Sequence, residues 1–380
     1  MRLASKTGPR RPQGDGDAAG EVSRPIDANV TAIRTASPAP LMATNSAPVR
    51  LLVAGAGAFG REHLSRLAER ADVNLTGVAD LNPAALDQIS SFVGNLNCWT
   101  DATRMIDGQK ADAIIVATPA ASHVEICAKA LSQNLCVLLE KPVATSAAAS
   151  RALLASMMMS TGFVLPGHVL RFSKEHQRLV DIVRSGRVGD VIYVNSRRYR
   201  DDSHASRYAD ADPVFTTLVH DIDLAQWITR SNFRSVRAHR SRGAGFRSMT
   251  TASAITETGI ACELRTAWTF SEGELPRDRL EVVGSRGSVE LTVGEALVLH
   301  YEGRRTDLGT TDGDDPLRRE QEHFLECVRY RSRKPALDLQ QAISGLELAE
   351  AAIESLPLGG ELALPREFLR HWAMNAGRAS

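Results

Sequence analysis

The chain has 380 residues, 43% of them hydrophobic, which is enough for about two domains with cores of their own. Its 45 basic side chains balance 45 acidic ones, which argues against a nucleic-acid partner and against charge-driven binding to a membrane. It has no apolar run of about 18 residues that could cross a membrane, and its five cysteines include no Cys-x-x-Cys pair, so neither a zinc site nor a redox dithiol is indicated. Such cysteine usage is typical of a reducing compartment, and we expect a cytoplasmic protein without a bound metal.

The first 48 residues differ in composition from the rest. They hold six of the 16 prolines and show no sustained apolar periodicity. Arg10 and Arg11 are not followed by the apolar segment that a twin-arginine export signal needs. We therefore expect residues 1–48 to be a disordered tail, with Met42 as an alternative start that the sequence leaves open, and residues 367–380 to be a second tail.

Residues 49–168 alternate between short apolar runs and helical patterns. Between two of these runs, Val124, Cys127, Ala128 and Leu131 form the apolar stripe of a crossover helix. The runs predict buried strands at 49–54, 75–79, 113–117, 135–139 and 162–167. Continuous apolar strands that alternate with helices predict an α/β fold, a doubly wound parallel sheet covered on both faces.

Residues 169–366 show a different pattern. Side chains at 260–270 alternate between apolar and polar, which predicts a half-exposed strand. The run Gly284-Ser285-Arg286-Gly287 between two apolar segments predicts a hairpin, and helices are expected at 317–331 and 339–353. We predict an α+β domain with an open, largely antiparallel sheet.

A glycine motif follows the first predicted strand and opens a helix. Gly55 permits a tight turn, Gly57 lets the backbone approach a pyrophosphate, and Gly60 lets helix and strand pack closely. The helix N-terminus offers N–H groups to the phosphates. Asp80, at the end of the second strand, can accept hydrogen bonds from ribose hydroxyls and would repel a 2′-phosphate, so NAD is favoured over NADP. The alternative is a strand-terminal aspartate without a ligand.

Further motifs occur along the chain in a fixed order. They are Val116-Ala117-Thr118-Pro119 with His123, Glu140-Lys141-Pro142, Gly167-His168 with Arg171-Phe172, His220-Asp221-Ile222-Asp223, and the hairpin at 282–287. Together with Gly55–Gly60, this order and spacing resemble the glucose–fructose oxidoreductase / inositol dehydrogenase / MocA (Gfo/Idh/MocA) family over residues 50–355. The resemblance implies a Rossmann domain followed by an α+β domain whose open sheet face often serves oligomer contacts. It also implies NAD(P)-dependent oxidation or reduction of sugars, inositols or nucleotide sugars.

The resemblance also implies roles for single residues. Lys141 matches the catalytic lysine, the following bond to Pro142 is often cis in the family, and His220 matches the family histidine. The cofactor-binding candidates are then Gly55, Gly57, Ala58, Phe59, Gly60, Asp80, Thr118, Pro119, His123, Glu140 and Lys141. The substrate-binding candidates are Lys141, His168, Arg171, Thr216 and His220.

Physical arguments support the two catalytic candidates. Lys141 lies just beyond a parallel strand, where ligands bind in such sheets, and its ammonium could stabilise a developing alkoxide. A solvated surface lysine is the alternative. His220 and Asp223 share a helix face with Leu224 and Trp227, so the imidazole could take a hydroxyl proton. The alternative is a core histidine hydrogen-bonded to Asp223.

Thr216 departs from the family pattern. Inositol-type members usually carry an aspartate four residues before the histidine, and a threonine cannot supply that charge.

Two other features have open interpretations. His168 and Arg171 either bind substrate or form structural hydrogen bonds, and the basic stretch from Arg197 to Arg207 is either a solvated strand face or a site for a substrate anion.

The sequence therefore predicts an NAD(P)-dependent oxidoreductase that passes hydride between nicotinamide and a secondary alcohol or ketone of a polyol, inositol or sugar-like substrate. We expect a homo-oligomer assembled through the open sheet face. Because fold does not fix function, a catalytically silent NAD-binding sensor is the main alternative, and an NAD-dependent glycosidase is another. The sequence does not identify the substrate.

Overall fold

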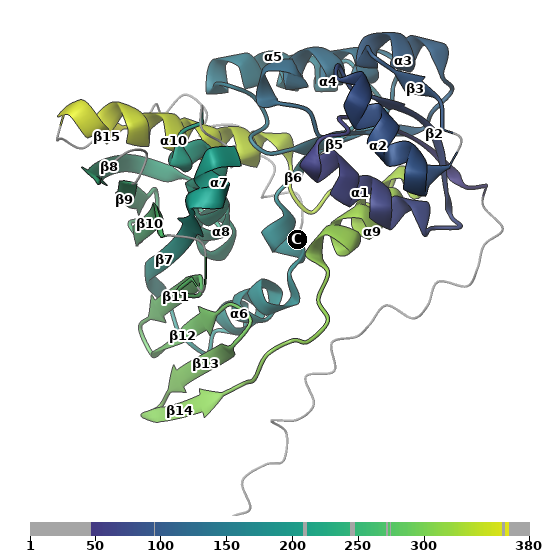
Figure 1. Cartoon of the computed structure of the whole chain (residues 1–380). Helices are drawn as coiled ribbons and strands as arrows, with labels where there is room; N and C mark the ends of the chain where they lie inside the picture. The colour runs from purple at the N-terminus through teal and green to yellow at the C-terminus, as the bar shows by residue number, and fades with distance from the viewer. Residues whose placement is uncertain are drawn as a thin grey trace, which may run out of the picture. The chain divides into compact units, whose positions relative to one another are not determined.

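The computed structural model describes residues 47–94, 96–207, 211–243, 248–270, 273, 275–358 and 362–364. The described residues belong to one compact unit (Figure 1). The predicted tails at 1–48 and 367–380 lie outside the described residues, except for Ala47 and Pro48, which are exposed coil. No helix in the described ranges is long and apolar enough to cross a membrane. All five cysteines lie in these ranges and carry free thiols.

The first sheet has six parallel strands in the order β3-β2-β1-β4-β5-β6. Its strands are β1 Val49–Ala54, β2 Val73–Ala79, β3 Cys98–Trp99, β4 Ala113–Val116, β5 Cys136–Glu140 and β6 Val164–Gly167. The helices between them are α1 Ala58–Ala68, α2 Pro83–Val93, α3 Ala102–Gly108, α4 His123–Ser132 and α5 Ala147–Met158, with a short 3₁₀ turn at Ala120–Ser122. The strand order reverses between β1 and β4, which is where ligands bind in sheets of this kind.

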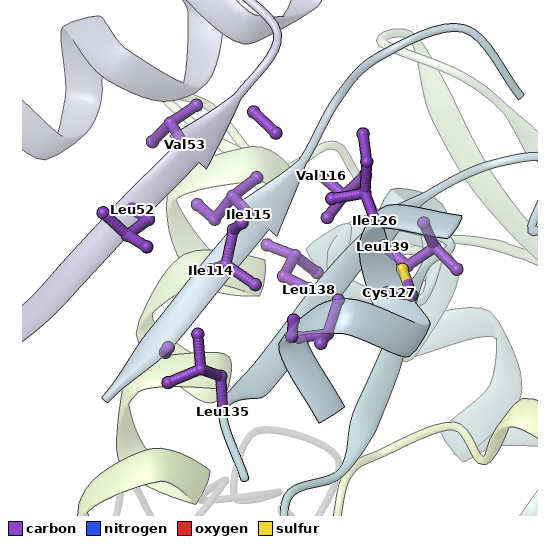
Figure 2. Close-up of a cluster of buried hydrophobic side chains, with 14 of the residues drawn as sticks. Leu52, Val53, Ile114, Ile115, Val116, Ile126, Cys127, Leu135, Leu138 and Leu139 are labelled. Carbon is purple, nitrogen blue, oxygen red and sulfur yellow. The ribbon is translucent and has the colours of Figure 1, made fainter. Parts of the chain in front are cut away.

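The predicted doubly wound sheet is confirmed. Its central strands are buried on both faces, because the apolar runs that predicted them are covered by helices on each side. Figure 2 shows Leu52, Ile115 and Leu138 of neighbouring strands packed together, with Ile126 and Cys127 of α4 close by. The two-residue strand β3 was not predicted, because so short a segment shows no periodicity.

The second sheet has nine strands in the order β14-β13-β12-β11-β7-β10-β9-β8-β15. Neighbours are antiparallel except β7 and β10, which are parallel. Its strands are β7 Val191–Asp201, β8 Phe233–Arg242, β9 Ser248–Thr256, β10 Ala261–Phe270, β11 Arg279–Gly284, β12 Gly287–Thr292, β13 Ala296–Tyr301, β14 Arg304–Asp307 and β15 Leu362–Ala363. The predicted hairpin is the β11–β12 pair, and the predicted half-exposed strand is β10. The expected open, largely antiparallel sheet is therefore confirmed.

Helices pack on one face of this second sheet. The remaining helical elements are a 3₁₀ turn at Val169–Phe172, α6 Lys174–Arg184, α7 Asp202–Arg207, a π-helical turn at Val214–Leu218, α8 Val219–Thr229, α9 Pro316–Arg329 and α10 Leu339–Leu358. Side chains of α6, α8 and α10 join the inward side chains of the strands in one core.

The two C-terminal helices return to the first sheet. Phe324 of α9 and Ile343 and Leu346 of α10 belong to the core of the parallel sheet, whereas Leu348 and Ala352 of α10 belong to the core of the second. One helix therefore takes part in both cores. The apolar stripe of α10 predicted the helix, but the stripe alone could not indicate which core it would fill.

Candidate active site and cofactor cleft

The glycine loop between β1 and α1 has room for a ligand at one of its three glycines. Gly55 has a φ of +102°, and a Cβ there would lie 2.5 Å from the carbonyl oxygen of Ala117. A Cβ on Gly60 would collide with the carbonyl oxygen of Gly55. A Cβ on Gly57 would meet nothing within 4 Å, so this residue faces open space. The following positions, Ala58 and Phe59, are exposed at the start of α1, which has no side-chain cap. The N–H groups at the start of α1 lack a side-chain cap, and the backbone of Gly57 beside them is accessible, so a pyrophosphate can bind there.

Asp80 ties the glycine loop to the end of β2. Its Oδ2 accepts a hydrogen bond from the backbone N–H of Ala56 at 2.7 Å, and its Oδ1 accepts one from that of Asn82 at 2.8 Å. Each carboxylate oxygen can accept a further hydrogen bond, so a ribose diol can still bind. Asp80 also lines a cavity of about 430 Å³, together with Leu81, Thr118 and Pro119. These residues and the glycine loop fit the adenosine half of a dinucleotide.

His123 lies behind this cavity rather than in it. The residue is 1% exposed, and its Nε2 lies 2.7 Å from the carbonyl oxygen of Thr118. Its Nδ1 lies 3.0 Å from the carbonyl oxygen of Pro142, which follows a cis peptide bond from Lys141. Burial lowers the pKa of His123, and the two carbonyl contacts oppose that shift. The ring thus holds together the loops that contain Thr118 and Pro142, at the edge of the cleft.

Glu140 also points into the interior. Its Oε1 accepts a hydrogen bond from Nε2 of His63 at 3.0 Å, and its Oε2 accepts one from the backbone N–H of Lys141 at 3.2 Å. Nδ1 of His63 in turn lies 3.0 Å from the side-chain nitrogen of Gln321 on α9. Sequence reasoning missed both partners. The available signal was that His63 lies three residues after Gly60, on the buried side of α1.

Glu320 lies beside this group. Its side chain is fully buried, and among the described residues neither carboxylate oxygen has a hydrogen-bond partner. Burial raises the pKa of Glu320 well above its usual range, and the nearby charge of Glu140 adds to the effect. Burial and the neighbouring carboxylate of Glu140 thus both favour the neutral acid form of Glu320.

Lys141 extends from the carboxyl end of β5 toward the second domain. The side chain is partly buried, and its Nζ donates a hydrogen bond to the backbone carbonyl oxygen of Thr216 at 3.0 Å. Burial lowers the pKa of Lys141, while the charge of Glu140 opposes this and the charges of Arg200 and Arg198 add to it.

Thr216 lies in the π-helical turn that precedes α8. The N–H of Val219 donates to the carbonyl oxygen of Val214, five residues back, as in a π-helix. The hydroxyl of Thr216 donates to the carbonyl oxygen of Asp212 at 3.2 Å. The position where inositol-type members carry an aspartate therefore meets Lys141 through its main chain, because its side chain is bound elsewhere.

His220 is the second residue of α8, and the cationic side chains of Lys141, Arg198 and Arg200 act on it. Burial lowers its pKa well below the usual value, and the charges of Lys141, Arg198, His168 and Arg200 lower it further. In the part of the chain that the structure describes, Nδ1 of His220 is buried without a hydrogen-bond partner. These effects favour the neutral ring, and its Nδ1 can exchange a hydrogen bond with a ligand.

Asp223 pairs with Arg171, not with His220. The Nε and Nη2 atoms of Arg171 donate to its carboxylate at 2.8 to 3.1 Å, and both residues are buried. The alternative of a core histidine bonded to Asp223 is therefore wrong. His168 lies with Nδ1 3.7 Å from Asp223, too far for a hydrogen bond. Arg171 thus sits in a buried ion pair, whereas the His168 ring keeps an unbonded nitrogen within the described structure.

The basic stretch on β7 is not a solvated face throughout. Arg198 is 5% exposed and donates to Asp221 of α8 at 3.0 and 3.1 Å. Asp278 accepts hydrogen bonds from Arg198 at 2.7 Å and from Arg200 at 3.2 Å. The solvated interpretation fails for Arg198, because alternate side chains of β7 face α8 and not solvent.

Family models match more than half of the chain. Residues 49–168 match the model of the oxidoreductase family with an NAD-binding Rossmann fold, and residues 176–290 match the Gfo/Idh/MocA C-terminal domain. The chain belongs to the Gfo/Idh/MocA family. The family prediction is confirmed, and so is the prediction of an NAD-binding domain.

Relatives by sequence include inositol 2-dehydrogenases. That of Salmonella typhimurium is 28% identical over 196 residues, 50% of this chain and 57% of the relative. That of Acidothermus cellulolyticus is 27% identical over 271 residues, 69% of this chain and 78% of the relative. The match therefore spans little more than half the length of the first of these relatives.

Solved structures show the same fold. Myo-inositol 2-dehydrogenase from Lactobacillus plantarum superposes with a TM-score of 0.74 at 21% identity, covering 84% of this chain and 100% of that one. Scyllo-inositol dehydrogenase from Lactobacillus casei, with NAD(H) and scyllo-inositol bound, gives 0.73 at 16% identity, covering 83% and 99%.

Proposed function

We propose that the protein is an NAD-dependent dehydrogenase of a secondary alcohol in a polyol, inositol or sugar-like substrate. One observation carries the proposal. Lys141 follows a parallel strand at the same edge of the sheet as the glycine loop, and its charge acts on the His220 ring, whose buried Nδ1 has no hydrogen-bond partner among the described residues. An amino group and a neutral imidazole beside a nicotinamide site suit a hydroxyl that loses hydride and proton.

The other predicted site residues divide into two groups. We assign Gly57, Ala58, Phe59, Asp80, Thr118 and Pro119 to direct contact with the cofactor, and Gly55 and Gly60 to the tight packing that shapes the loop around it. His123 and Glu140 act behind it by holding the loops around Lys141 in place. His168 contacts substrate through its unbonded nitrogen, whereas Arg171 acts through Asp223.

When bound, NAD⁺ accepts the hydride. Lys141 and His220 would both hydrogen-bond the substrate oxygen, and the amino group of Lys141 would stabilise the alkoxide character that develops there. A polyol fits these groups because its several hydroxyls can satisfy buried polar atoms that otherwise lack partners.

The test is a screen of inositols, aldoses and sugar acids for NADH formation by absorbance, with the variant Lys141→Ala as control. We expect Lys141→Ala to keep its NAD affinity in calorimetry and to lose turnover by about 10²-fold or more. Near-normal turnover in that variant would contradict the assignment.

Thr216 in place of the family aspartate favours a catalytically silent NAD-binding protein as the second candidate. Tight NAD binding without NADH from any substrate would support that candidate, and glycoside cleavage without net NADH would support the NAD-dependent glycosidase.

We also infer that the protein assembles with copies of itself through the outer face of the nine-stranded sheet. Outward side chains of β7 and β10, such as Tyr193, Asn195 and Arg265, lie opposite the face that α8 covers. Arg265 and Asn195 are joined there by a hydrogen bond of 2.8 Å. Light scattering coupled to size-exclusion chromatography measures the assembly, and a monomer mass would contradict it. A cytoplasmic location stays a prediction.

A further inference from the structure

We propose that the substrate carries an anionic oxygen group, a carboxylate or a phosphate, apart from the hydroxyl that is oxidised, and that Arg200 recognises this group. The inference rests on the proposed dehydrogenase function and narrows its substrate class from polyols in general to acidic ones. It also gives a role to the part of the basic stretch on β7 that is not buried.

Arg200 lies on the inner face of the nine-stranded sheet. Side chains along a strand alternate between its two faces, so Arg200 shares the face of Arg198, which pairs with a carboxylate of α8. Trp268 of β10 is in register with Arg200, and its Nε1 donates a hydrogen bond to the hydroxyl of Thr217 at 3.0 Å. Thr217 belongs to the π-helical turn that leads into α8. Arg200 therefore belongs to the part of the sheet that packs against the start of the helix carrying the catalytic histidine.

The two inner arginines of β7 differ in how firmly they are held. Arg198 is 5% exposed, and Asp221 and Asp278 accept its hydrogen bonds at 2.7 to 3.1 Å. The side chain of Arg200 is 28% exposed, and its two hydrogen bonds to Asp278 are both 3.2 Å long. Its Nη1 also donates to the carbonyl oxygen of Tyr199. Arg198 is thus a structural residue, whereas Arg200 is accessible and loosely paired.

One edge of the Arg200 guanidinium is available to a ligand. Among the described residues its Nε has no hydrogen-bond acceptor, and Nη2 has only the 3.2 Å contact with Asp278. If Nη2 turned to a ligand, Asp278 would keep the donors of Arg198 and of the Tyr199 backbone. The Nε and Nη2 atoms together form the planar pair of donors that binds a carboxylate or a phosphate through two parallel hydrogen bonds.

A cavity adjoins this arginine. Arg200, Arg277 and Asp278 line an open cavity of about 380 Å³. This volume falls in the range of small-molecule sites, about 300–1,000 Å³. Arg277 is the more exposed of the two arginines at 58%, and it pairs with Glu295 at 3.5 Å. The cavity therefore gives an anionic group access to Arg200, with a second cation at its border.

The charges at the catalytic residues also favour an anion. Burial lowers the pKa of His220, and the charges of Lys141, Arg198 and Arg200 lower it further. The charge of Arg200 acts on Lys141 as well, so Arg200 lies near both catalytic groups. Thr216 is uncharged where inositol-type members usually carry an aspartate, and an aspartate there would repel an anionic substrate. In a partly buried site such charges attract an anion more strongly than they would in water.

The groups of the site then divide between two parts of the substrate. Lys141 and His220 contact the hydroxyl that is oxidised, and Arg200 contacts the anionic group. The buried Nδ1 of His168, which has no hydrogen-bond partner among the described residues, remains for a further hydroxyl. Such a division predicts that loss of Arg200 weakens substrate binding more than it slows the chemical step.

The test compares matched neutral and anionic compounds. Aldoses, the corresponding uronates and the corresponding sugar phosphates are assayed for NADH formation, and so are inositols and inositol phosphates. We expect the highest kcat/KM with an anionic compound, and the two anionic series show whether the site takes a carboxylate or a phosphate. Arg200→Gln should raise the KM of that compound about tenfold or more, with a smaller effect on kcat, because a charge-assisted hydrogen bond is lost. Arg200→Lys, which keeps the charge without the paired donors, should raise it less.

The matched control is Arg305→Gln, which removes an exposed arginine on β14 of the same sheet and should leave the KM unchanged. Melting temperatures show whether the variants fold. A measurement that needs no variant is the salt dependence in the wild type, where the KM of the anionic compound should rise with ionic strength while that of its neutral parent stays constant. A neutral compound as the best substrate, an unchanged KM in folded Arg200→Gln, or equal salt dependence of the two compounds would overturn the proposal.

Failure of the proposed function looks different. In that case the anionic compounds still bind the NAD-loaded protein in calorimetry, and bind more weakly to Arg200→Gln, but none of them yields NADH. That result would refute the dehydrogenase and keep the anion site.

Discussion

Gln321 donates a hydrogen bond to Nδ1 of His63 at 3.0 Å, and thereby decides which nitrogen of that ring carries the proton. The same amide nitrogen lies 3.1 Å from the backbone carbonyl oxygen of His63, which fixes the amide with its nitrogen inward. Nε2 of His63 must then be the protonated nitrogen, and it donates to Glu140. Helix α9 therefore sets the hydrogen bond that Glu140, the residue before Lys141, receives from His63, although Gln321 and His63 lie 258 residues apart in the sequence.

The buried acid next to this group makes stability depend on pH. The pKa of Glu320 is raised in the folded protein, so its contribution to stability is fully present below the unfolded value of about 4.3 and is lost as pH rises through the folded pKa. Glu320→Gln cannot ionise. We expect its melting temperature to exceed that of the wild type at pH 8 and to equal it near pH 4. The control is Glu322→Gln on the same helix, whose side chain is 46% exposed and should matter little at either pH. An equal effect of Glu320→Gln at both pH values would contradict a neutral buried acid.

Two glycines of the same loop should respond differently to alanine. A methyl group on Gly57 meets open space, so Gly57→Ala should keep its melting temperature and weaken NAD binding about tenfold or more, because the methyl group occupies the path of the pyrophosphate. A methyl group on Gly60 meets the carbonyl oxygen of Gly55, so Gly60→Ala should cost about 1–3 kcal/mol of stability. Thermal melts and calorimetry separate the two outcomes. Unchanged NAD affinity in Gly57→Ala would place the pyrophosphate elsewhere.

Asp80 should set the preference for NAD. Its carboxylate also receives the backbone N–H groups of Ala56 and Asn82, so its replacement affects both the ribose and the loop. Asp80→Asn retains one acceptor oxygen and removes the charge, whereas Asp80→Ser removes both carboxylate oxygens. We expect the affinity for NAD to fall in both variants, and to fall more in Asp80→Ser. The difference between the affinities for NAD and NADP should become smaller, because the charge no longer repels a 2′-phosphate. Calorimetry with both cofactors decides, and tighter binding of NADP by the wild type would show the prediction to be wrong.

The ion pair of Arg171 and Asp223 should act mainly on stability. Both residues are buried, so removing one partner strands a charge, and Arg171→Gln should lower the free energy of unfolding by about 3–5 kcal/mol. Arg104→Gln, which removes an 82% exposed side chain, is the control and should change it by less than about 0.5 kcal/mol. Urea unfolding measures both. A stable Arg171→Gln variant with a raised KM would instead show that Arg171 binds substrate directly.

The sequence by itself determined the parts of this protein that depend on neighbours along the chain. The strands β1, β4 and β5 were predictable because each is one continuous apolar run, and a parallel sheet covered by helices is the way to bury such runs. The glycine loop was predictable because its glycines occur at a fixed spacing and each meets a local steric requirement. The order of motifs around Glu140-Lys141-Pro142 then indicated the family.

Tertiary structure decided the partners of the buried polar groups. Arg171 and Asp223 lie 52 residues apart, and Lys141 and Thr216 lie 75 apart, so no periodicity links them. The sequence placed Thr216 as a side chain near the histidine, but the π turn presented its carbonyl instead. The physical reason is that a hydrogen bond in the interior requires its two atoms to lie within about 3 Å with suitable angles. That geometry is set only after separate segments have packed together, and the residue type at a position does not reveal whether its side chain or its backbone will supply the atom.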